Sequence, residues 1–351
     1  MREELLTYNK VLEEIGEESK KLLLGNGFSM AYDKDRFSFT SLLESAISKN
    51  IIQKDSAIYK VFSKCNTSDF EEIIRNLETA LEILKVYKSN TQLEEHLRDD
   101  SEKLKSCLVD VITNNHPDKI TSIPSVNLHK ASDFIQAYDA LYTLNYDLLL
   151  YWVTETLRER MEASRMINEK SVFVDGFGGT CSSEYVCFNN FSSRNTCFYL
   201  HGALHIFDNG DKIVKKTFSR TGKCLKEQIK EELNCNKYPV IVSEGRSDQK
   251  MAKIIHNNYL NHCYKSLSNI SGNLVVLGTL LKSNDEHILE AILRNKVKKI
   301  YFGVSDLKKA KQDLASFIFK ANDKKKEVRF YDYRSVSIWG DIAKKENNDK
   351  L

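Results

Sequence analysis

Four short segments of this 351-residue sequence combine glycines with side chains that do chemistry. Each follows a run of apolar or β-branched residues: GNGFS at 25–29, TLNYD at 143–147, LHG at 200–202 and LGTLLKSND at 277–285. Glycines let a backbone approach a phosphate group closely, while amide, carboxylate and imidazole groups supply hydrogen bonds and proton transfer. The four segments together predict a site that binds a phosphorylated ligand and acts on it.

The first segment has the pattern of a phosphate-binding turn. The apolar run at 21–24 predicts a buried strand, and Gly25-Asn26-Gly27 then leads into a helix whose first N–H groups face an anion. The third glycine of the usual dinucleotide fingerprint is absent, because Met30 stands there. A tight strand-to-helix turn without any ligand explains this segment, taken alone, equally well.

The second segment places three polar side chains at alternate positions after a strand. Two-residue periodicity puts Thr143, Asn145 and Asp147 on one face at the carboxyl edge of the sheet. Ligands of open α/β sheets bind at this edge. A cap on a helix beginning at Leu148 is the alternative for Asp147, but it does not account for Asn145.

The third segment places a histidine at the end of an apolar strand. His201 is followed directly by a glycine and is suited to acid–base chemistry near neutral pH, although a structural, hydrogen-bonded histidine is the alternative. His205 lies four residues further on, but the segment is not helical and offers no third ligand. We therefore expect no metal site here.

The elements that position these segments alternate between strand and helix. Apolar runs that predict buried strands occupy 21–27, 140–147, 196–202, 238–245, 273–279, 298–304 and 327–333. Helical spacing of apolar residues follows at 254–267, 285–294 and 306–321. This order predicts the α/β class, with a Rossmann-like, doubly wound parallel sheet.

One region interrupts the alternation. Residues 40–135 are patterned almost entirely as helices, and Ser68 with Glu71 predicts a capping box in front of one of them. We therefore expect an α/β domain formed by 1–39 and 136–351, with an all-helical insertion at 40–135. The sequence leaves open whether the insertion is a lid, an oligomer interface or a docking site.

Composition excludes several functional classes. Lys and Arg (52) nearly balance Asp and Glu (49), so the net charge does not indicate nucleic acid, and no carboxylate cluster suits Mg²⁺. The charged N-terminus lacks the apolar core of a signal peptide, and the apolar run at 274–281 is too short to span a bilayer. The eight cysteines form no CxxC pair. We expect a cytoplasmic protein with reduced thiols and no membrane contact.

The order of the four segments resembles that of the sirtuin superfamily. Its members carry a GAG-[IV]-S turn, a T-x-N-[ID]-D-like segment, LHG and a GTS-like loop, each after a strand. The similarity is greatest to a bacterial branch with GNGFS and VSEG segments, and VSEG occurs here at 242–245. Sirtuin-like proteins of this kind are often NAD-depleting effectors of antiviral defence.

The resemblance implies roles for individual residues. The dinucleotide-binding turn corresponds to Gly25, Asn26, Gly27, Phe28 and Ser29, and the loop near the adenosine end to Gly278 and Thr279. Thr143 contributes to the same cofactor site, while Asn145 and Asp147 lie beside the nicotinamide and its ribose. His201 matches the catalytic histidine. The implied catalytic set is Asn145, Asp147 and His201.

The departures from the superfamily indicate which reaction to expect. The chain has no CxxC pairs for the zinc module of deacylases, and the insertion leaves an acyl-lysine groove in doubt. We expect NAD as the substrate of a glycohydrolase that releases nicotinamide and ADP-ribose without a metal. Asn145 would hold the attacking water or the ribose hydroxyls, and His201 would accept a proton.

Other functions fit the same pocket. It would also serve a non-catalytic NAD or ADP-ribose sensor, or an ADP-ribosyltransferase. A homo-oligomer or an activating partner protein is compatible with an enzyme that must be restrained in the cell.

Overall fold

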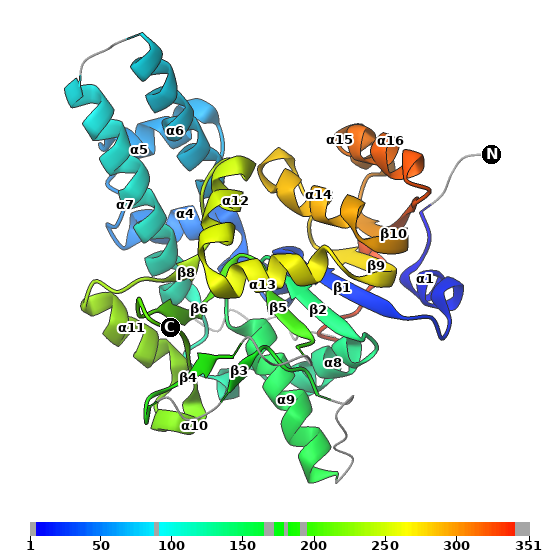
Figure 1. Ribbon diagram of the computed structural model, residues 1–351. Coiled ribbons are helices and arrows are strands. Elements are labelled where there is room, and N and C mark those ends of the chain that lie inside the picture. Colours follow the sequence, from blue (N-terminus) through cyan, green and yellow to red (C-terminus); the bar gives the residue numbers. More distant parts are fainter. Residues whose placement is uncertain (1–4, 88–90, 165–171, 179–181, 190–194, 341–351) are drawn as a thin grey trace, which may run out of the picture.

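The computed structural model of the chain describes residues 5–87, 91–164, 172–178, 182–189 and 195–340. Its centre is a six-stranded parallel sheet in the order β11-β10-β9-β1-β2-β5 (Figure 1). In chain order the strands are β1 Lys20–Leu24, β2 Ala140–Thr143, β5 Cys197–Tyr199, β9 Ser271–Leu277, β10 Lys296–Val304 and β11 Glu327–Asp332. Counted along the chain this is the 3-2-1-4-5-6 order of doubly wound dinucleotide-binding folds. The predicted α/β class is confirmed.

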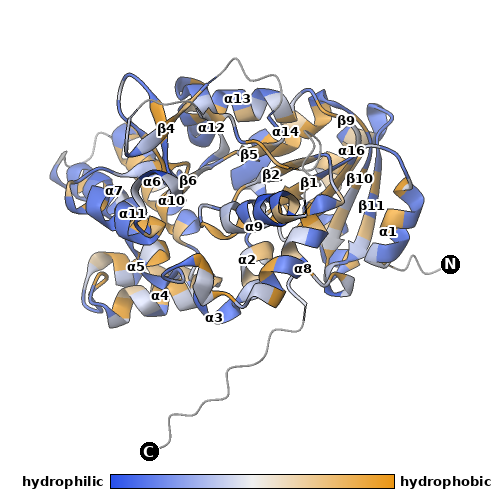
Figure 2. Ribbon diagram, turned by 90° about the horizontal axis from the view of Figure 1, so that it is seen from below, coloured by the Kyte–Doolittle hydropathy of each residue, from blue (hydrophilic) through white to orange (hydrophobic). Residues whose placement is uncertain are grey.

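Helices cover both faces of this sheet. One face carries α13 (Asn258–Leu267), α14 (Glu286–Arg294) and α16 (Ala315–Asp323), and the other carries α2 (Gly27–Tyr32), α8 (Ser125–Gln136) and α9 (Leu149–Ala163) (Figures 1 and 2). The central strands are consequently apolar on both sides. Leu22, Leu23 and Leu24 of β1 are fully buried, as expected for a parallel strand between two helical layers.

The helices predicted at 254–267 and 306–321 are each divided in two. The side chain of Asn257 accepts hydrogen bonds from the N–H groups of Tyr259 and Leu260, and it separates α12 (Ser247–His256) from α13. The second helix breaks at Leu314, between α15 (Leu307–Asp313) and α16. Helix α1 (Tyr8–Ile15) packs beside β11, at one edge of the parallel sheet.

A second, antiparallel sheet has the order β3-β4-β7-β6-β8. Its strands are β3 Phe177–Gly178, β4 Tyr185–Phe188, β6 Gly202–Asp208, β7 Ile213–Lys216 and β8 Pro239–Ile241, with α10 (Phe218–Thr221) and α11 (Leu225–Asn234) between the last two. The prediction that 238–245 forms a strand of the parallel sheet is therefore wrong. β8 pairs with β6, which leaves the parallel sheet directly after β5.

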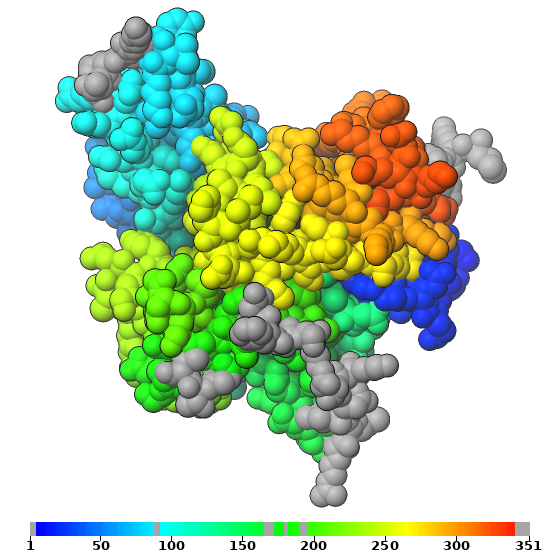
Figure 3. Space-filling view, in the orientation of Figure 1, coloured from blue at the N-terminus to red at the C-terminus, as the bar shows by residue number. Residues whose placement is uncertain are grey.

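The described chain between β1 and β2 is helical. After α2 it contains α3 Lys34–Phe37, α4 Phe39–Ser48, α5 Ala57–Cys65, α6 Phe70–Val86, α7 Thr91–Asn115, a 3₁₀ turn at Ile120–Ser122 and α8. Helices α5, α6 and α7 project from the sheet as an arm (Figures 1 and 3). The predicted Ser68–Glu71 capping box is wrong, because Asp69 caps α6 by accepting from the N–H groups of Glu71 and Glu72. The domain boundaries at 39/40 and 135/136 stay a prediction.

The cysteines differ in part from expectation. Cys65, Cys107, Cys197, Cys224, Cys235 and Cys263 are free thiols. Cys187 is disulfide-bonded, so the expectation of reduced thiols fails at this position. Among the helices of the described residues, none is both long and apolar enough to cross a membrane.

Candidate functional site

The register of the parallel sheet brings the four predicted segments to one level. Leu24 of β1 pairs with Thr143 of β2 and with Leu277 of β9, and Thr143 pairs with Tyr199 of β5. The next residues at the carboxyl edge are therefore Gly25, Leu144, Gly278 and Leu200. The strand order reverses between β1 and β9, and ligands of doubly wound sheets bind at such a reversal.

The glycine turn and the loop after β9 contact each other through their backbones. The N–H of Gly25 donates to Leu277 O and that of Gly27 to Gly278 O, each at 2.9 Å. Gly278 has a φ of +79°, and a Cβ on Gly27 would lie 2.4 Å from Gly278 Cα. Only glycines permit this approach. In this structure both N–H groups are engaged between the loops rather than open to an anion.

Three of the residues assigned to the cofactor have structural contacts. Asn26 Nδ2 donates to Phe37 O at 3.0 Å, and Thr279 Oγ1 accepts from Leu281 N at 3.0 Å. Phe28 is fully buried, with its ring centroid 5.1 Å from that of Trp339. These side chains stabilise the two loops, and a role in ligand binding stays a prediction for each of them.

Ser29 joins two of the predicted catalytic residues. Its hydroxyl donates to Asp147 Oδ2 and accepts from Asn145 Nδ2 at 2.9 Å, and all three side chains are buried. Asp147 Oδ1 also accepts from Leu149 N at 2.8 Å, at the start of α9. Burial raises the pKa of Asp147, while the hydrogen bonds from Ser29 and Leu149 oppose the rise. The cap explanation for Asp147 is thus compatible with a site role.

The orientation of the Asn145 amide follows from this network. A serine hydroxyl has one hydrogen, and a carboxylate only accepts, so the hydrogen of Ser29 goes to Asp147. Ser29 must then accept from Asn145, which turns the amide nitrogen toward the serine. Among the described hydrogen bonds, none uses Oδ1 of Asn145 as acceptor, and this oxygen is available to a ligand or a water.

His201 lies in a turn that only a glycine can complete. Gly202, the next residue, has a φ of +78°, and a Cβ on it would lie 1.8 Å from Val240 O. This close contact between β6 and β8 explains why a glycine follows His201, and it fixes the backbone position of His201. Within the part of the chain that the structure describes, His201 and Asn145 share no hydrogen bond, but the two residues each lie two positions beyond the paired residues Thr143 and Tyr199.

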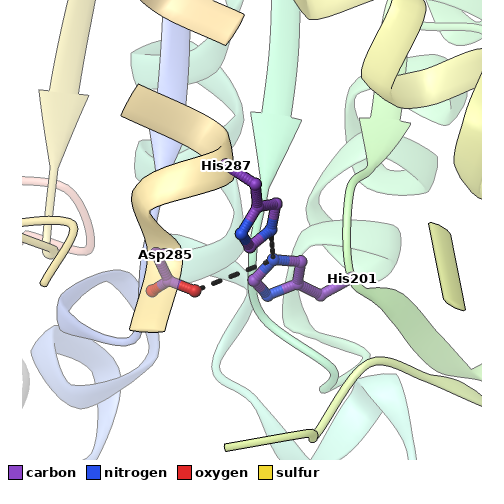
Figure 4. A group of neighbouring side chains, drawn as sticks. All are labelled: His201, Asp285 and His287. Atoms are coloured by element: carbon purple, nitrogen blue, oxygen red, sulfur yellow. Dashed lines mark hydrogen bonds and ion pairs between the residues drawn. The ribbon is translucent and has the colours of Figure 1, made fainter. Parts of the chain in front are cut away.

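The partners of His201 come from the start of α14 (Figure 4). Its Nε2 lies 3.1 Å from His287 Nε2 and 3.9 Å from Asp285 Oδ1. Both imidazoles are buried, with exposed fractions of 2% and 3%. Burial and the positive charge of Lys250 lower the pKa of His201 well below its usual 6.5, and the same causes lower that of His287 to about 3. Both rings are neutral at pH 7.

Ser247 determines how the two imidazoles share a proton. Its hydroxyl oxygen accepts from His287 N at 2.8 Å and lies 3.0 Å from His287 Nδ1. If Ser247 also accepts from Nδ1–H, then His287 Nε2 accepts from His201 Nε2–H, and His201 Nδ1 keeps a free lone pair. If Ser247 donates to His287 Nδ1 instead, His287 Nε2 carries the proton and donates to His201 Nε2, and the proton of His201 is then on Nδ1.

A buried ion cluster completes the site. Lys250 of α12 is fully buried, and its Nζ donates to Glu71 Oε2 at 2.7 Å and to Asp285 Oδ1 at 2.9 Å. Tyr146 OH donates to Glu71 Oε1 at 2.6 Å, and Asn284 Nδ2 donates to Glu71 Oε2 at 3.0 Å. Burial disfavours the charge on Lys250, but the two carboxylates outweigh it and raise its pKa. Glu71 thereby links the helical arm to the segments after β2 and β9.

The sequence patterns predict one part of this site but not the other. Ser29, Asn145 and Asp147 meet as a group, and His201 belongs to the second group around α14. The second group also contains Glu71, Lys250, Asp285 and His287, none of which was assigned a role at the site. Asp285 ends one of the four predicted segments, but an acidic residue at the start of a helix is also explained by the helix dipole alone.

A groove lies elsewhere, on the helical arm. Its volume is about 530 Å³. It is lined by Ile51, Ile52, Ile58, Asp99, Glu102, Lys103, Leu104, Ser106, Cys107, Asp110 and Tyr238. The lining includes none of the predicted site residues, so the groove is separate from the chemistry at the sheet edge.

The fold and the site define an α/β protein of the doubly wound class, with polar side chains gathered where its strand order reverses. Residues 22–339 match the family model described as a domain of unknown function, DUF4917, and the chain belongs to this family. No curated protein matches the chain.

Proposed function

We propose that the chain is a sirtuin-like hydrolase of NAD that cleaves the bond between nicotinamide and ribose. One observation carries the proposal. The four segments occur in the sirtuin-like order and leave neighbouring strands at one level, with Asn145 and His201 each two residues beyond the paired residues Thr143 and Tyr199. The resemblance further supports a cytoplasmic role as an NAD-depleting effector of antiviral defence.

Asn145 is suited to hold the nucleophile. Its amide nitrogen is engaged with Ser29, which presents Oδ1 as an acceptor for a water or a ribose hydroxyl. Ser29 is held in turn by Asp147, so the amide is oriented before any ligand arrives. An orientation fixed in advance is what positioning catalysis requires. We assign Asp147 to this positioning and to the start of α9, rather than to proton transfer.

His201 is suited to accept a proton. A base must be uncharged at the working pH, and burial beside Lys250 lowers the pKa of His201 far enough to keep it so. In the arrangement in which Ser247 accepts from His287, the Nδ1 lone pair of His201 is free. This nitrogen would take the proton from the attacking water, directly or through a ribose hydroxyl.

The reaction requires no further catalytic group for the departure of nicotinamide. Nicotinamide leaves as a neutral base from a cationic ring, so no strong acid is needed. The water oxygen forms a bond to the ribose carbon as the bond to nicotinamide breaks, and the products are nicotinamide and ADP-ribose. Contact of the pyrophosphate with the N–H groups of Gly25 and Gly27 would require the loop at Gly278 to move away.

The test compares rates of NAD cleavage among four variants of the purified full chain. Because positioning and base catalysis each contribute about 10²-fold or more, Asn145→Ala and His201→Ala should lower nicotinamide release by at least that factor. The matched controls are Asn209→Ala and His256→Ala, whose side chains are exposed, and both should retain the wild-type rate. Circular dichroism confirms folding. Wild-type rates in a folded Asn145→Ala variant would overturn the assignment.

A further inference from the structure

Three side chains of the types that ligate metals, His201, Asp285 and His287, meet where α14 begins, and the proposed NAD chemistry uses only His201 among them. The Nε2 atoms of His201 and His287 lie 3.1 Å apart, and Asp285 Oδ1 lies 3.9 Å from the first of them. All three ligand atoms lie within 4.8 Å of one another (Figure 4). Tetrahedral zinc, with bonds of about 2.0–2.2 Å, places its ligand atoms about 3.3–3.6 Å apart. An ion therefore fits among the three after small side-chain rotations.

The donor set indicates which ions would bind. Two imidazoles with one carboxylate suit zinc, cobalt and ferrous iron, whereas Mg²⁺ and Ca²⁺ prefer oxygen ligands alone. Both imidazoles are buried, and their Nε2 atoms face each other at 3.1 Å. We propose that His201, His287 and Asp285 form a binding site for a divalent transition-metal ion, with zinc as the best match.

The surroundings provide the outer contacts that metal sites use. A ligating histidine usually donates its second nitrogen to an oxygen, and His287 Nδ1 lies 3.0 Å from Ser247 Oγ. A ligating carboxylate is usually hydrogen-bonded as well, and Asp285 Oδ1 accepts from Lys250 at 2.9 Å. Both partners lie on α12 and are independent of the three ligands.

The charge balance of the cluster also favours a cation. Glu71 and Asp285 contribute two negative charges and Lys250 contributes one positive charge, which leaves a net charge of −1 beside two uncharged imidazoles. Opposite charges in a buried site attract more strongly than at a surface. Lys250 is already matched by Glu71, so the charge on Asp285 remains for the ion.

Metal binding has a consequence for the proposed reaction. An ion on Nε2 of His201 fixes the ring proton on Nδ1 and removes the free lone pair there. The same ion would then inhibit NAD cleavage. This expected inhibition rests on the proposed function. The metal site itself does not depend on NAD chemistry, because binding is measured without NAD.

The experiment titrates the chelator-treated full chain with Co²⁺, followed by visible absorption, and with Zn²⁺, followed by calorimetry. We expect one ion per chain and a cobalt spectrum without thiolate charge-transfer bands. Loss of an outer partner weakens a metal site by about 10–100-fold, so His287→Ala and Asp285→Asn should weaken it by more than about 100-fold. The exposed His256 is the matched control, and His256→Ala should bind as wild type does.

Two results would overturn the proposal. One is the absence of saturable binding to the folded wild-type chain. The other is binding that survives in His287→Ala with thiolate bands, which would assign the ion to free cysteines such as the exposed Cys65 and Cys235. If His287→Ala fails to fold, His287→Gln serves instead, with circular dichroism as the check. Retained binding in that folded variant would equally contradict the site.

Discussion

Replacing Glu71 with glutamine tests whether one buried ion cluster ties the helical arm to the sheet edge. Lys250 is fully buried, and its Nζ lies 2.7 Å from Glu71 and 2.9 Å from Asp285. Removing one partner of a buried ion pair costs about 3–5 kcal/mol, because the other charge is left uncompensated. Asp285 still faces Lys250 in the variant, so we expect the free energy of unfolding to fall by about 2–3 kcal/mol.

Urea unfolding measures this loss against a control in the same helix. Glu82 of α6 pairs with Lys85 at 2.8 Å, but both side chains are about half exposed, so Glu82→Gln should leave the unfolding midpoint unchanged. Lys250→Met combined with Glu71→Gln should cost less than the sum of the single changes, because the double variant lacks the Glu71 charge that Lys250→Met alone leaves without its partner, and only Asp285 stays without its lysine. Equal midpoints for Glu71→Gln and Glu82→Gln would show that the buried ion cluster does not stabilise the fold.

Two further predictions concern buried polar groups. Ser29→Ala removes the hydroxyl that joins Asn145 to Asp147, and it should lower the free energy of unfolding by about 1–3 kcal/mol in urea; an unchanged value would contradict the network. Among the described residues, none forms a hydrogen bond with either ring nitrogen of the buried His205, and burial, followed by the positive charge of Lys215, lowers its pKa to about 3. The unfolded chain therefore binds a proton that the folded chain excludes between about pH 6.5 and 3, so stability falls on acidification. In His205→Phe the free energy of unfolding should fall less steeply on acidification, by about 1.4 kcal/mol per pH unit within this range. Equal slopes of unfolding free energy against pH in the two proteins would contradict a neutral, buried His205.

The parallel sheet could be predicted because its strands are buried on both faces. Leu22, Leu23 and Leu24 form a continuous apolar run, as do the residues of β9, and such runs identify a parallel strand between helices. The run in β8 has the same appearance. β8 differs from these strands only in the strand beside it. The chain turns away from the parallel sheet after β5, and β6, which begins at Gly202, pairs with β8. That pairing depends on tertiary contacts, which a local pattern does not contain.

The site could be predicted in part for a similar reason. Asn145 and Asp147 follow β2, and Ser29 follows β1, which is the neighbouring strand in the sheet. The three side chains therefore meet as a result of strand order alone. Glu71 stands at a helix start, where an acidic residue usually has a local role. Its bond to Lys250 joins residues 179 positions apart, and that from Lys250 to Asp285 joins residues 35 apart. Lys250 itself lies on an amphipathic helix, where a lysine is normally solvated.

The proposed hydrolysis of NAD fixes the stoichiometry of its products, and measuring that stoichiometry tests the proposal. Purified wild-type protein is incubated with NAD, and free nicotinamide and free ADP-ribose are quantified in the same reaction. Hydrolysis predicts equal molar amounts of the two products. Nicotinamide in excess, with ADP-ribose attached to protein, would indicate transfer instead. A folded chain that releases neither product and binds neither NAD nor ADP-ribose in a calorimetric titration would contradict the proposed NAD hydrolysis.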